Sequence, residues 1–307
     1  MTLQPNIVAV VVNYNSGGWL RSCVTSILES DVSCVVCVVD NASTDHSFDD
    51  VKSLEEQQGN LKCIRNEDNI GFSRAVNQVM RNNPADYYVI VNPDCVVGPR
   101  TISTIVGALE VDARNGLGSC LIENIDGTPQ KTCRRSFPTP WSGLIRLLAL
   151  NRLFPSSTIF KDFDAGSEEP PKHTVTVDAI SGAFMVAKGA AVKKVGLLDE
   201  EYFMHCEDLD WCKRFWEAHY NVIYVPGVSV VHAKGVSGEK ERIRVLWHLH
   251  RGMIRFYQKF YRERYSLPVR WLVYTGVYMR FFVQSLGRLM GSVLGFRTTH
   301  TKRQAES

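Results

Sequence analysis

The sequence predicts an α/β protein with a doubly wound, mostly parallel central sheet, followed by a helical C-terminal region. Over the first 120 residues, short β-rich apolar runs alternate with amphipathic stretches, which is the pattern of βαβ units. Asn, Asp and Ser follow several of these runs directly, as expected where strand ends face a ligand. Beyond Gly238 the pattern is helical throughout, so we expect residues 1–238 and 239–307 to form separate parts.

The alternation defines the expected elements of the first part. The apolar runs are rich in β-branched residues, and the stretches between them are amphipathic. The predicted strands are Ile7–Val12, Cys34–Val39, Leu61–Arg65 and Tyr87–Val91. The predicted helices are Trp19–Glu29, Phe48–Gln58, Ser73–Asn82 and Arg100–Val111.

Residues 123–173 interrupt this rhythm. They contain six prolines, so we interpret them as an insertion or lid that carries a short helix around Trp141–Leu150. Regular structure is expected to resume at Thr174. The elements predicted there are strands at Val175–Val177, Ala183–Ala187, Val222–Tyr224 and Ser229–His232, and a helix at Glu207–Ala218.

Charge is distributed unevenly along the chain, whose formal net charge is +3. Residues 239–307 hold 14 Lys and Arg against 4 Asp and Glu, whereas residues 1–238 hold 21 against 28. Such a basic block can bind nucleic acid or an anionic membrane. Its neighbours are apolar and aromatic, which favours an anionic membrane surface, and no recognised nucleic-acid-binding module is present.

The nine cysteines predict free thiols rather than a disulfide framework, because they lie scattered through apolar stretches. Cys34 and Cys37 form a C-x-x-C, but strand positions three apart point to opposite faces, which disfavours a zinc or redox pair. The first six residues lack the basic start and apolar core of a signal peptide. These features together predict a cytoplasmic protein.

Three predicted strands end in polar residues: Asn13-Tyr14-Asn15, Asp40 to Asp45, and Asn92-Pro93-Asp94. One such run alone is ordinary turn chemistry, but three at the carboxyl edge of one sheet indicate a ligand site. Neither a G-x-G-x-x-G after the first strand nor a P-loop is present, so a diphosphate needs another counter-charge. Asp94 can provide it by holding a divalent cation that bridges phosphate oxygens.

These motifs resemble glycosyltransferase family 2, which has the GT-A fold, and within it the rhamnosyltransferase-like branch. The resemblance spans roughly residues 6–260 and keeps the order and spacing of the family. The matching stretches are Val10–Asn15, Val38–Asp45, Asn69–Asn77, Asn92–Asp94, Ser181–Phe184, Val195–Glu200, Glu207–Arg214 and His232–Ser237.

The resemblance implies an inverting glycosyltransferase whose GT-A catalytic domain is residues 1–238. In the family, the Asp that matches Asp40 holds the nucleoside, and the loop after the first strand packs on the base. Gly71 would allow close backbone approach to the nucleotide at a helix N-terminus. The residues assigned to nucleotide-sugar binding are Asn13, Tyr14, Asn15, Asp40, Asn69, Gly71, Asn77, Asn92 and Asp94.

A divalent metal, Mg²⁺ or Mn²⁺, is the implied cofactor. Asn92-Pro93-Asp94 stands where many relatives carry Asp-x-Asp, so only Asp94 keeps a carboxylate. The resemblance implies that His232 completes the coordination, although a lone His after a strand is also commonly structural.

Inversion requires one carboxylate that removes the acceptor proton. Glu207 and Asp208 open a predicted helix in a run with three carboxylates within four residues, more than helix capping requires. By resemblance, the base is Asp208, and Glu207 holds the acceptor or the base itself. Asp210 and Arg214 are expected to form an ion pair across one helical turn.

Three further residues are assigned to acceptor binding. Trp211 is expected to floor the sugar site, with a core position as the alternative. Arg134 and Arg135, in the inserted segment, are expected to contact an acceptor phosphate.

The C-terminal stretch Val269–Phe296 carries only Arg270, Arg280 and Arg288 as charges, and on a helix these fall within an arc of about 80°. A spanning helix would place Arg280 near the bilayer centre at a cost of roughly 2.5–3.5 kcal/mol, so a position in the headgroup plane is favoured. The alternative is a helix packed on the catalytic domain or on a second subunit of a homodimer.

We therefore expect a peripheral enzyme on the inner face of the plasma membrane that acts on a lipid-linked saccharide acceptor in bacterial surface polysaccharide synthesis, such as that of O-antigen. The resemblance indicates dTDP-L-rhamnose as the donor, and the alternative is a UDP-hexose or UDP-N-acetylhexosamine. A nucleotidyltransferase would need a glycine-rich basic loop after the first strand. A non-catalytic membrane-binding module would leave the ordered acidic motifs unexplained.

Overall fold

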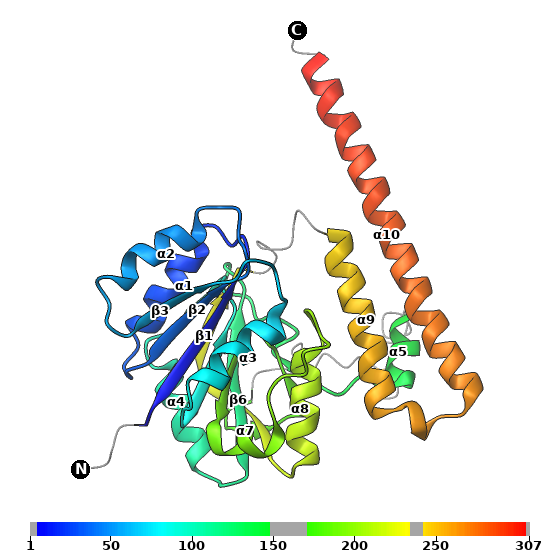
Figure 1. Ribbon diagram of the computed structural model, residues 1–307. Coiled ribbons are helices and arrows are strands. Elements are labelled where there is room, and N and C mark those ends of the chain that lie inside the picture. The colour runs from blue at the N-terminus through cyan, green and yellow to red at the C-terminus, as the bar shows by residue number, and fades with distance from the viewer. Residues whose placement is uncertain (1–4, 148–170, 234–241, 305–307) are drawn as a thin grey trace. The chain divides into compact units, whose positions relative to one another are not determined.

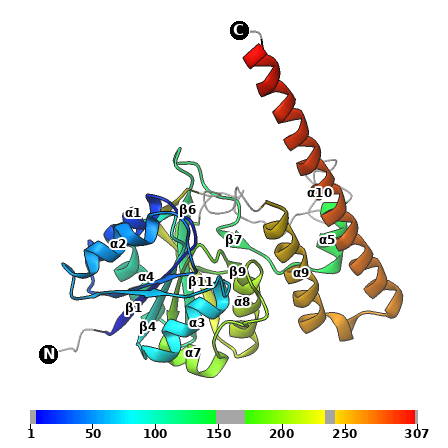
Figure 2. The ribbon, with the colours of Figure 1, turned by 45° about the horizontal axis from the view of Figure 1, so that its top comes forward.

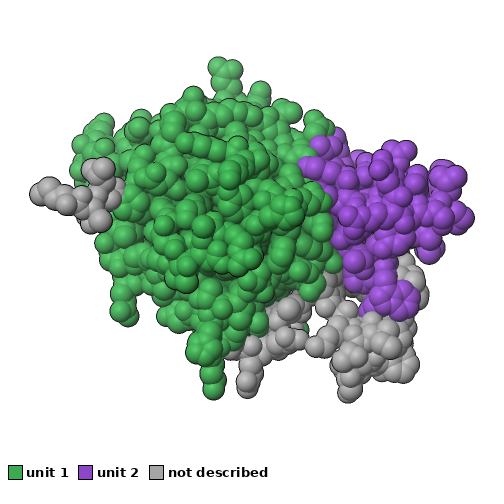
Figure 3. All heavy atoms as spheres, turned by 90° about the horizontal axis from the view of Figure 1, so that it is seen from below, with its two compact units in different colours: residues 1–137, 163–237 green, residues 138–162, 238–307 purple. Residues whose placement is uncertain are grey.

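The structure is a computed structural model that describes residues 5–147, 171–233 and 242–304. The chain divides into two compact units (Figure 3): unit 1 comprises residues 1–137 and 163–237, and unit 2 comprises residues 138–162 and 238–307. Residues 148–170 of the predicted lid and the stretch Lys234–Ser237 lie outside the described residues.

Unit 1 is built on one mixed sheet with a small separate ribbon. The strands of the sheet are β1 Ile7–Asn13, β2 Val35–Asp40, β3 Leu61–Arg65, β4 Tyr87–Val91, β5 Cys95–Val97, β6 Asn115–Glu123, β8 Val175–Thr176, β10 Phe184–Lys188 and β11 Asn221–His232. The ribbon pairs β7 Arg134–Arg135 with β9 Ala179–Ile180. The helices of unit 1 are α1 Trp19–Leu28, α2 Ser47–Glu55, α3 Phe72–Asn82, α4 Thr101–Glu110, α7 Gly189–Val195 and α8 Glu207–Glu217.

The sheet order is β3-β2-β1-β4-β10-β6-β11-β5, with β8 paired to β11 (Figure 1). The strands β1 to β4 are parallel, as predicted, whereas β10 runs antiparallel to both β4 and β6, and β5 runs antiparallel to β11. Because β10 is reversed, its beginning lies at the same edge as the carboxyl ends of β1, β2 and β4. The end of β11 reaches this edge as well, because β11 is parallel to β6.

Helices cover both faces of this sheet (Figure 2), which explains why its central strands are almost uninterrupted runs of apolar residues. All residues of β1 and β4 are buried. Ile7, Ala9 and Val11 of β1 join a core with apolar residues of α1 and α4. The alternate residues of β1 point to the other face, where α3 contacts β1 and β2.

The predicted strands and helices of the first 111 residues are confirmed, with ends that differ by at most three residues. The two predicted strands Val222–Tyr224 and Ser229–His232 are halves of the single strand β11. The register of β11 against β6 shifts between Val225 and Ser229, and Gly227 in this interval has φ +83°. A bulge at Gly227 therefore replaces the expected chain break.

Strand β6 was not predicted, although it lies in the interior of the sheet between β10 and β11. Its sequence contains Gly116 and Gly118, which weaken a strand pattern. A Cβ atom at Gly116 would lie 2.9 Å from Phe215 of α8, and one at Gly118 would lie 2.9 Å from Ile105 of α4. The glycines therefore allow two helices to pack closely on β6.

Unit 2 is helical, as predicted, and contains α5 Pro140–Leu147, α9 Arg242–Phe260, a 3₁₀ turn Arg262–Arg264 and α10 Leu267–Gln304. Rings join α9 to α10: the centroids of Tyr257 and Tyr274 are 5.9 Å apart, and Phe281 is 5.5 Å from both Trp247 and His250. Among the described residues, no helix is both long enough and apolar enough to cross a bilayer.

A substitution at Gly71 tests the junction between α3 and the loop that precedes α8. Gly71 has φ +88°, and a Cβ atom there would lie 2.8 Å from the carbonyl oxygen of Phe203. Gly71→Ala is therefore expected to lower the free energy of unfolding by at least about 2 kcal/mol in urea titrations. In the control Gly107→Ala, where nothing lies within 4 Å of the new Cβ, a gain of roughly 0.5–1 kcal/mol is expected for this helical site. Equal shifts in the two variants would contradict this account.

Candidate active site at the carboxyl edge of the sheet

Two residues predicted to bind the nucleotide, Asn13 and Asp40, form a buried hydrogen-bond network beneath the loops. The side-chain amide of Asn13 contacts Asp40 Oδ1 at 2.7 Å, Ser47 Oγ at 2.9 Å and Ser43 Oγ at 3.1 Å. Asp40 Oδ2 accepts the Ser43 amide at 3.1 Å and lies 3.5 Å from Arg65 Nε. Both predicted side chains are 0% exposed, so in this structure they shape the loops that precede α1 and α2.

Asn15 joins these two loops to each other. Its side-chain oxygen accepts the amides of Thr44 at 2.8 Å and Asp45 at 3.2 Å, and the Gly17 amide donates to Asp45 Oδ2 at 2.9 Å. Asn15 has φ +52°, a conformation that Asn tolerates better than most residues. The half-buried Tyr14 precedes it, in the loop expected to pack on the base.

The residues of the segment 69–77 make contacts within the protein. Asn69 Oδ1 accepts the Gly71 amide at 3.1 Å and so closes the turn before α3. The close approach at Gly71 is to Phe203 and serves packing within the protein. Asn77 is 1% exposed. Its side-chain Nδ2 donates to the Leu198 carbonyl at 2.8 Å, and its Oδ1 accepts the backbone amide of Leu198 at 3.0 Å. This structure therefore gives Asn77 a structural role in place of the expected nucleotide contact.

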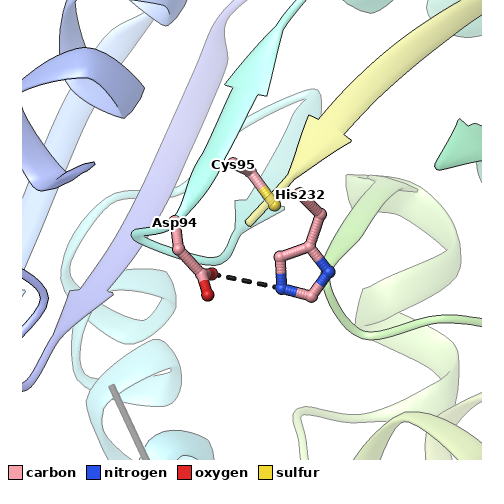
Figure 4. Close-up of side chains that lie close together, drawn as sticks. All are labelled: Asp94, Cys95 and His232. Carbon is pink, nitrogen blue, oxygen red and sulfur yellow. Dashed lines mark ion pairs between the residues drawn. The ribbon is translucent and has the colours of Figure 1, made fainter. Parts of the chain in front are cut away.

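The predicted cation ligands Asp94 and His232 lie side by side (Figure 4). His232 Nε2 is 3.2 Å from Asp94 Oδ1, and its Nδ1 is 3.2 Å from Gln130 Oε1. The pairing of β5 with β11 places His232 opposite Cys95, and the Ala233 amide donates to the Asp94 carbonyl at 2.9 Å. Gln130, which the sequence did not single out, orients the imidazole so that Nε2 faces the carboxylate.

The donor set fits a divalent cation. Ligand atoms of Asp94, Cys95 and His232 lie within 4.8 Å of one another. Burial raises the pKa of the Cys95 thiol well above its ordinary value, and its Sγ donates to the Ala183 carbonyl at 3.4 Å, so Cys95 is a poor ligand for a hard cation. Asp94 and His232 supply the oxygen and nitrogen ligands that suit Mn²⁺ or Mg²⁺, and phosphate oxygens can occupy the remaining positions.

The turn after β4 also reaches towards the predicted base. Half-buried Asn92 donates its amide to the Ala183 carbonyl at 2.9 Å. The neighbouring Gly182 amide donates to Asp208 Oδ2 at 2.9 Å. A Cβ atom at Gly182 would lie 3.1 Å from Cβ of Asp208, so a glycine permits this approach. The cation ligands and the predicted base are therefore anchored to the same edge of the sheet.

Asp208 is held as a carboxylate. Its Oδ2 accepts hydrogen bonds from Gly182 and from the Arg135 guanidinium, and its Oδ1 accepts the Leu209 amide at 2.7 Å. Burial alone would raise the pKa of Asp208, but the charge and hydrogen bond of Arg135, with the two amides, lower it below the usual value.

Glu207 is in the opposite state. It is 8% exposed, and among the described residues its Oε2 has no hydrogen-bond partner. Burial and then the charge of Asp208 raise the pKa of Glu207 to about 8. At neutral pH, Glu207 therefore holds a proton while Asp208 carries the negative charge of the pair.

The three residues predicted to bind the acceptor lie largely inside the protein, and for Trp211 the core position given as the alternative is the one observed. Trp211 is 0% exposed, packs edge-on against Phe215 and donates its indole N–H to the Gly196 carbonyl at 2.9 Å, so it belongs to the core. Arg134 is buried with its guanidinium 5.2 Å from the ring centroid of Tyr224.

Arg135 is likewise withdrawn from the surface. Its side chain is 12% exposed and pairs with Asp208.

The ion pair expected between Asp210 and Arg214, one helical turn apart on α8, is confirmed: Arg214 Nε lies 2.6 Å from Asp210 Oδ1.

A mixed sheet is covered by helices on both faces, and its carboxyl edge carries two rigid loops, the two cation ligands Asp94 and His232, and the carboxylate of Asp208. This combination is that of a glycosyltransferase with the GT-A fold. The family model of Glycosyl transferase family 2 matches residues 8–166, slightly more than half of the chain. The chain therefore belongs to glycosyltransferase family 2, as its motifs predicted.

The chain is also similar to individual family members. It is 25% identical over 274 residues to the N-acetylglucosaminyl-diphospho-decaprenol L-rhamnosyltransferase of Mycobacterium tuberculosis, which covers 85% of this chain and 87% of that protein. It is 26% identical over 149 residues to the rhamnosyltransferase WbbL of Escherichia coli, which covers 48% of this chain and 52% of WbbL. These similarities support the rhamnosyltransferase-like branch.

Solved structures agree on the fold. The mannosyltransferase PcManGT from Pyrobaculum calidifontis, in complex with GDP-Man and Mn²⁺, superposes with a TM-score of 0.59 at 16% identity and covers 96% of this chain and 81% of its own. GalNAc-T7 with UDP, GalNAc and Mn²⁺ gives a TM-score of 0.62 at 15% identity and covers 86% of this chain and 49% of its own. Both neighbours contain Mn²⁺, in keeping with a divalent metal in this fold.

The protonation of Glu207 is testable through the pH dependence of stability. Because the folded-state pKa of Glu207 is raised, its contribution to stability is full at low pH and is lost as pH rises towards about 8. Glu207→Gln removes this loss, so the stability of the variant relative to the wild type should increase between pH 5 and pH 8, by at most about 1.4 kcal/mol per pH unit. Thermal unfolding across this range measures it, with the exposed Glu201→Gln as control. A constant difference between Glu207→Gln and wild type would contradict the assignment.

Proposed function

We propose that this enzyme transfers L-rhamnose, with inversion, from dTDP-L-rhamnose to a lipid-linked saccharide in bacterial surface polysaccharide synthesis. The Mycobacterium tuberculosis relative, aligned over 87% of its length, bears an acceptor of this kind in its name, N-acetylglucosaminyl-diphospho-decaprenol. The second relative, WbbL, is also named a rhamnosyltransferase. The observation that carries the proposed chemistry is the geometry of Asp208, whose carboxylate is held by Arg135, Gly182 and the Leu209 amide at the sheet edge where Asp94 meets His232.

Asp94 and His232 would hold a Mg²⁺ or Mn²⁺ ion, and this ion would supply positive charge for the departing nucleoside diphosphate. The loops around Asn15 and Asp40 position the nucleotide, because the buried network beneath them fixes their backbone.

Asp208 removes the proton of the attacking acceptor hydroxyl. Its Oδ2 is occupied by Gly182 and Arg135, whereas Oδ1 accepts one amide and keeps a lone pair for the hydroxyl. Glu207 is protonated at neutral pH and therefore cannot take that proton, although it can hold the acceptor through a hydrogen bond. This difference favours Asp208 as the base, the role that the family resemblance implied.

A hexose donor is the second candidate. The low-salt glycan biosynthesis hexosyltransferase Agl10 of Haloferax volcanii is 23% identical over 241 residues, which covers 77% of this chain and 70% of that protein. A donor assay separates the two candidates directly.

The expected donor and base are tested together. Wild-type enzyme is incubated with Mn²⁺, an N-acetylglucosaminyl-diphospho-polyprenol acceptor and either dTDP-L-rhamnose, UDP-glucose or UDP-N-acetylglucosamine. We expect product from dTDP-L-rhamnose, and a loss of at least about 10³-fold in Asp208→Asn, because the proton acceptor is gone. Product from a UDP-sugar alone would refute the rhamnosyl assignment, and near-normal turnover of Asp208→Asn would remove Asp208 from the mechanism.

Binding of the donor nucleotide, measured apart from turnover, separates the role of Asp208 from that of Asp94. Asp208→Asn should keep Mn²⁺-dependent binding of the nucleotide, seen as a ligand-induced rise in melting temperature. Asp94→Ala should lose that rise, because the carboxylate ligand is absent.

We further propose that unit 1 is the catalytic domain and that unit 2 attaches the enzyme to the inner face of the plasma membrane through α10. Large apolar side chains are exposed along one side of this helix, within an arc of about 160°. They are Leu267, Trp271, Leu272, Tyr278, Met279, Phe282, Val283, Leu286 and Leu289.

The arginines of α10 lie on its other side. Arg280 and Arg288 fall on this side, and their charges act, after burial, to lower the pKa of His250 on α9. Arg270 is turned back to the Tyr265 carbonyl at 2.9 Å. The proposed lipid contact is therefore the apolar side of α10, with the basic seam of Arg270, Arg280 and Arg288 on the opposite side of the helix. With α9, unit 2 still offers a net positive charge to an anionic leaflet.

Vesicle binding tests this attachment. The double variant Trp271→Glu/Phe282→Glu is expected to co-sediment with phosphatidylglycerol-containing vesicles at least about 10-fold more weakly than wild type, because two exposed apolar anchors become charged. Val111→Glu, at an apolar residue of unit 1 that is 85% exposed, should bind as wild type does. Unchanged vesicle binding of the double variant, or its conversion from a dimer to a monomer in size-exclusion chromatography, would contradict membrane attachment through this face.

A further inference from the structure

Arg135 reaches the predicted base from a distant part of the chain. It lies on β7, where it pairs with Ala179 of β9. Its Nη2 donates to the Ile180 carbonyl at 2.5 Å and to Asp208 Oδ2. The side chains of Arg135 and Asp208 are only 12% and 13% exposed, so this is a nearly buried ion pair held in place by a backbone carbonyl.

Among the charged groups near Glu207 and Asp208, Arg135 affects the two carboxyl groups differently. Within α8, Asp210 is neutralised by Arg214 at 2.6 Å. Burial raises the pKa values of the Cys206 and Cys212 thiols, which are therefore neutral. The charge of Arg135 acts on both Glu207 and Asp208, and between these two carboxylates its guanidinium donates a hydrogen bond to Asp208.

Glu207 and Asp208 by themselves do not determine which of the two carries the negative charge. Glu207 and Asp208 are adjacent, both are buried, and each disfavours ionisation of the other. Without a cation, a single negative charge could lie on either residue. The guanidinium and the Gly182 amide converge on Asp208 Oδ2, which stabilises the charge on Asp208 and fixes the orientation of its carboxylate.

We propose that Arg135 is the positioning residue of the catalytic base: its guanidinium selects Asp208 over Glu207 as the ionised carboxylate and aims Oδ1 at the acceptor. This inference rests on the proposed function in that Asp208 is the base. It replaces the expected role of Arg135 in binding an acceptor phosphate, since the guanidinium is directed into the protein.

The test is the pH dependence of steady-state transfer by Arg135→Met, which removes the charge at similar side-chain length. Loss of the cation should raise the apparent pKa of the base, so the acid limb of the kcat/KM profile should move up by at least about one pH unit. At pH 7, kcat should fall by about 100-fold or more, because Asp208 loses the donor that orients its carboxylate. KM for the donor should stay within about twofold of wild type.

Arg134→Met is the matched control, because Arg134 is the neighbouring, equally buried arginine of β7 and stacks on Tyr224. It is expected to lower stability and to leave the acid limb in place. Arg135→Lys keeps the charge but not the planar fork, so it should show an intermediate kcat and a smaller shift of the acid limb. If thermal melting shows that Arg135→Met is unfolded, Arg135→Lys carries the test.

Three results would overturn the proposal for Arg135: an unshifted acid limb with wild-type kcat in Arg135→Met, an equal shift in Arg134→Met, or a selective rise in the acceptor KM. The last result would restore the phosphate-contact role. Asp208→Asn separates this failure from that of the proposed function. If Asp208→Asn is inactive while Arg135→Met keeps the wild-type profile, the base assignment stands and the role of Arg135 fails.

Discussion

The antiparallel pairing of β10 with β4 is the contact on which the site depends. It brings the beginning of β10 to the edge where parallel strands end, so the Ala183 carbonyl meets the Asn92 amide and the Gly182 amide meets Asp208. Two adjacent residues, Gly182 and Ala183, thus connect the turn that carries Asp94 to the helix that carries Asp208. If β10 ran parallel to β4, its beginning, and with it Gly182 and Ala183, would lie at the opposite edge of the sheet.

Polar groups in the site are of two kinds, and burial has different consequences for each. Asn13 and Asp40 are fully buried and form hydrogen bonds with each other and with the loop that precedes α2. These bonds make the proposed nucleotide side of the site rigid. Glu207 and Asp208 are both buried, but the Arg135 guanidinium contacts Asp208, so the pKa of Asp208 is lowered while that of Glu207 is raised. Burial therefore has two results: Asn13 and Asp40 fix the loops proposed to bind the nucleotide, and Asp208 is left as the proposed proton acceptor.

Local pattern predicted most of the fold, and the sequence motifs predicted which polar residues gather at the sheet edge. Strand β6 was missed because Gly116 and Gly118 lack side chains, a feature explained only by the helices that pack there. The contacts of Arg135 with Asp208 and of Gln130 with His232 join residues 73 and 102 positions apart, which local pattern cannot reveal. Likewise, the motif around Trp211 is that of the family site, yet the amphipathic periodicity of α8 turns this ring into the core.

Crystals grown with Mn²⁺ and a nucleoside diphosphate offer the most direct measurement of the central claim, that cation and base serve one site. Anomalous scattering at the manganese edge should give a peak coordinated by Asp94 and His232 and by the diphosphate, with Asp208 Oδ1 open towards the same ligand. A manganese peak away from Asp94 and His232, or a nucleotide bound where Asp208 does not face it, would contradict the account.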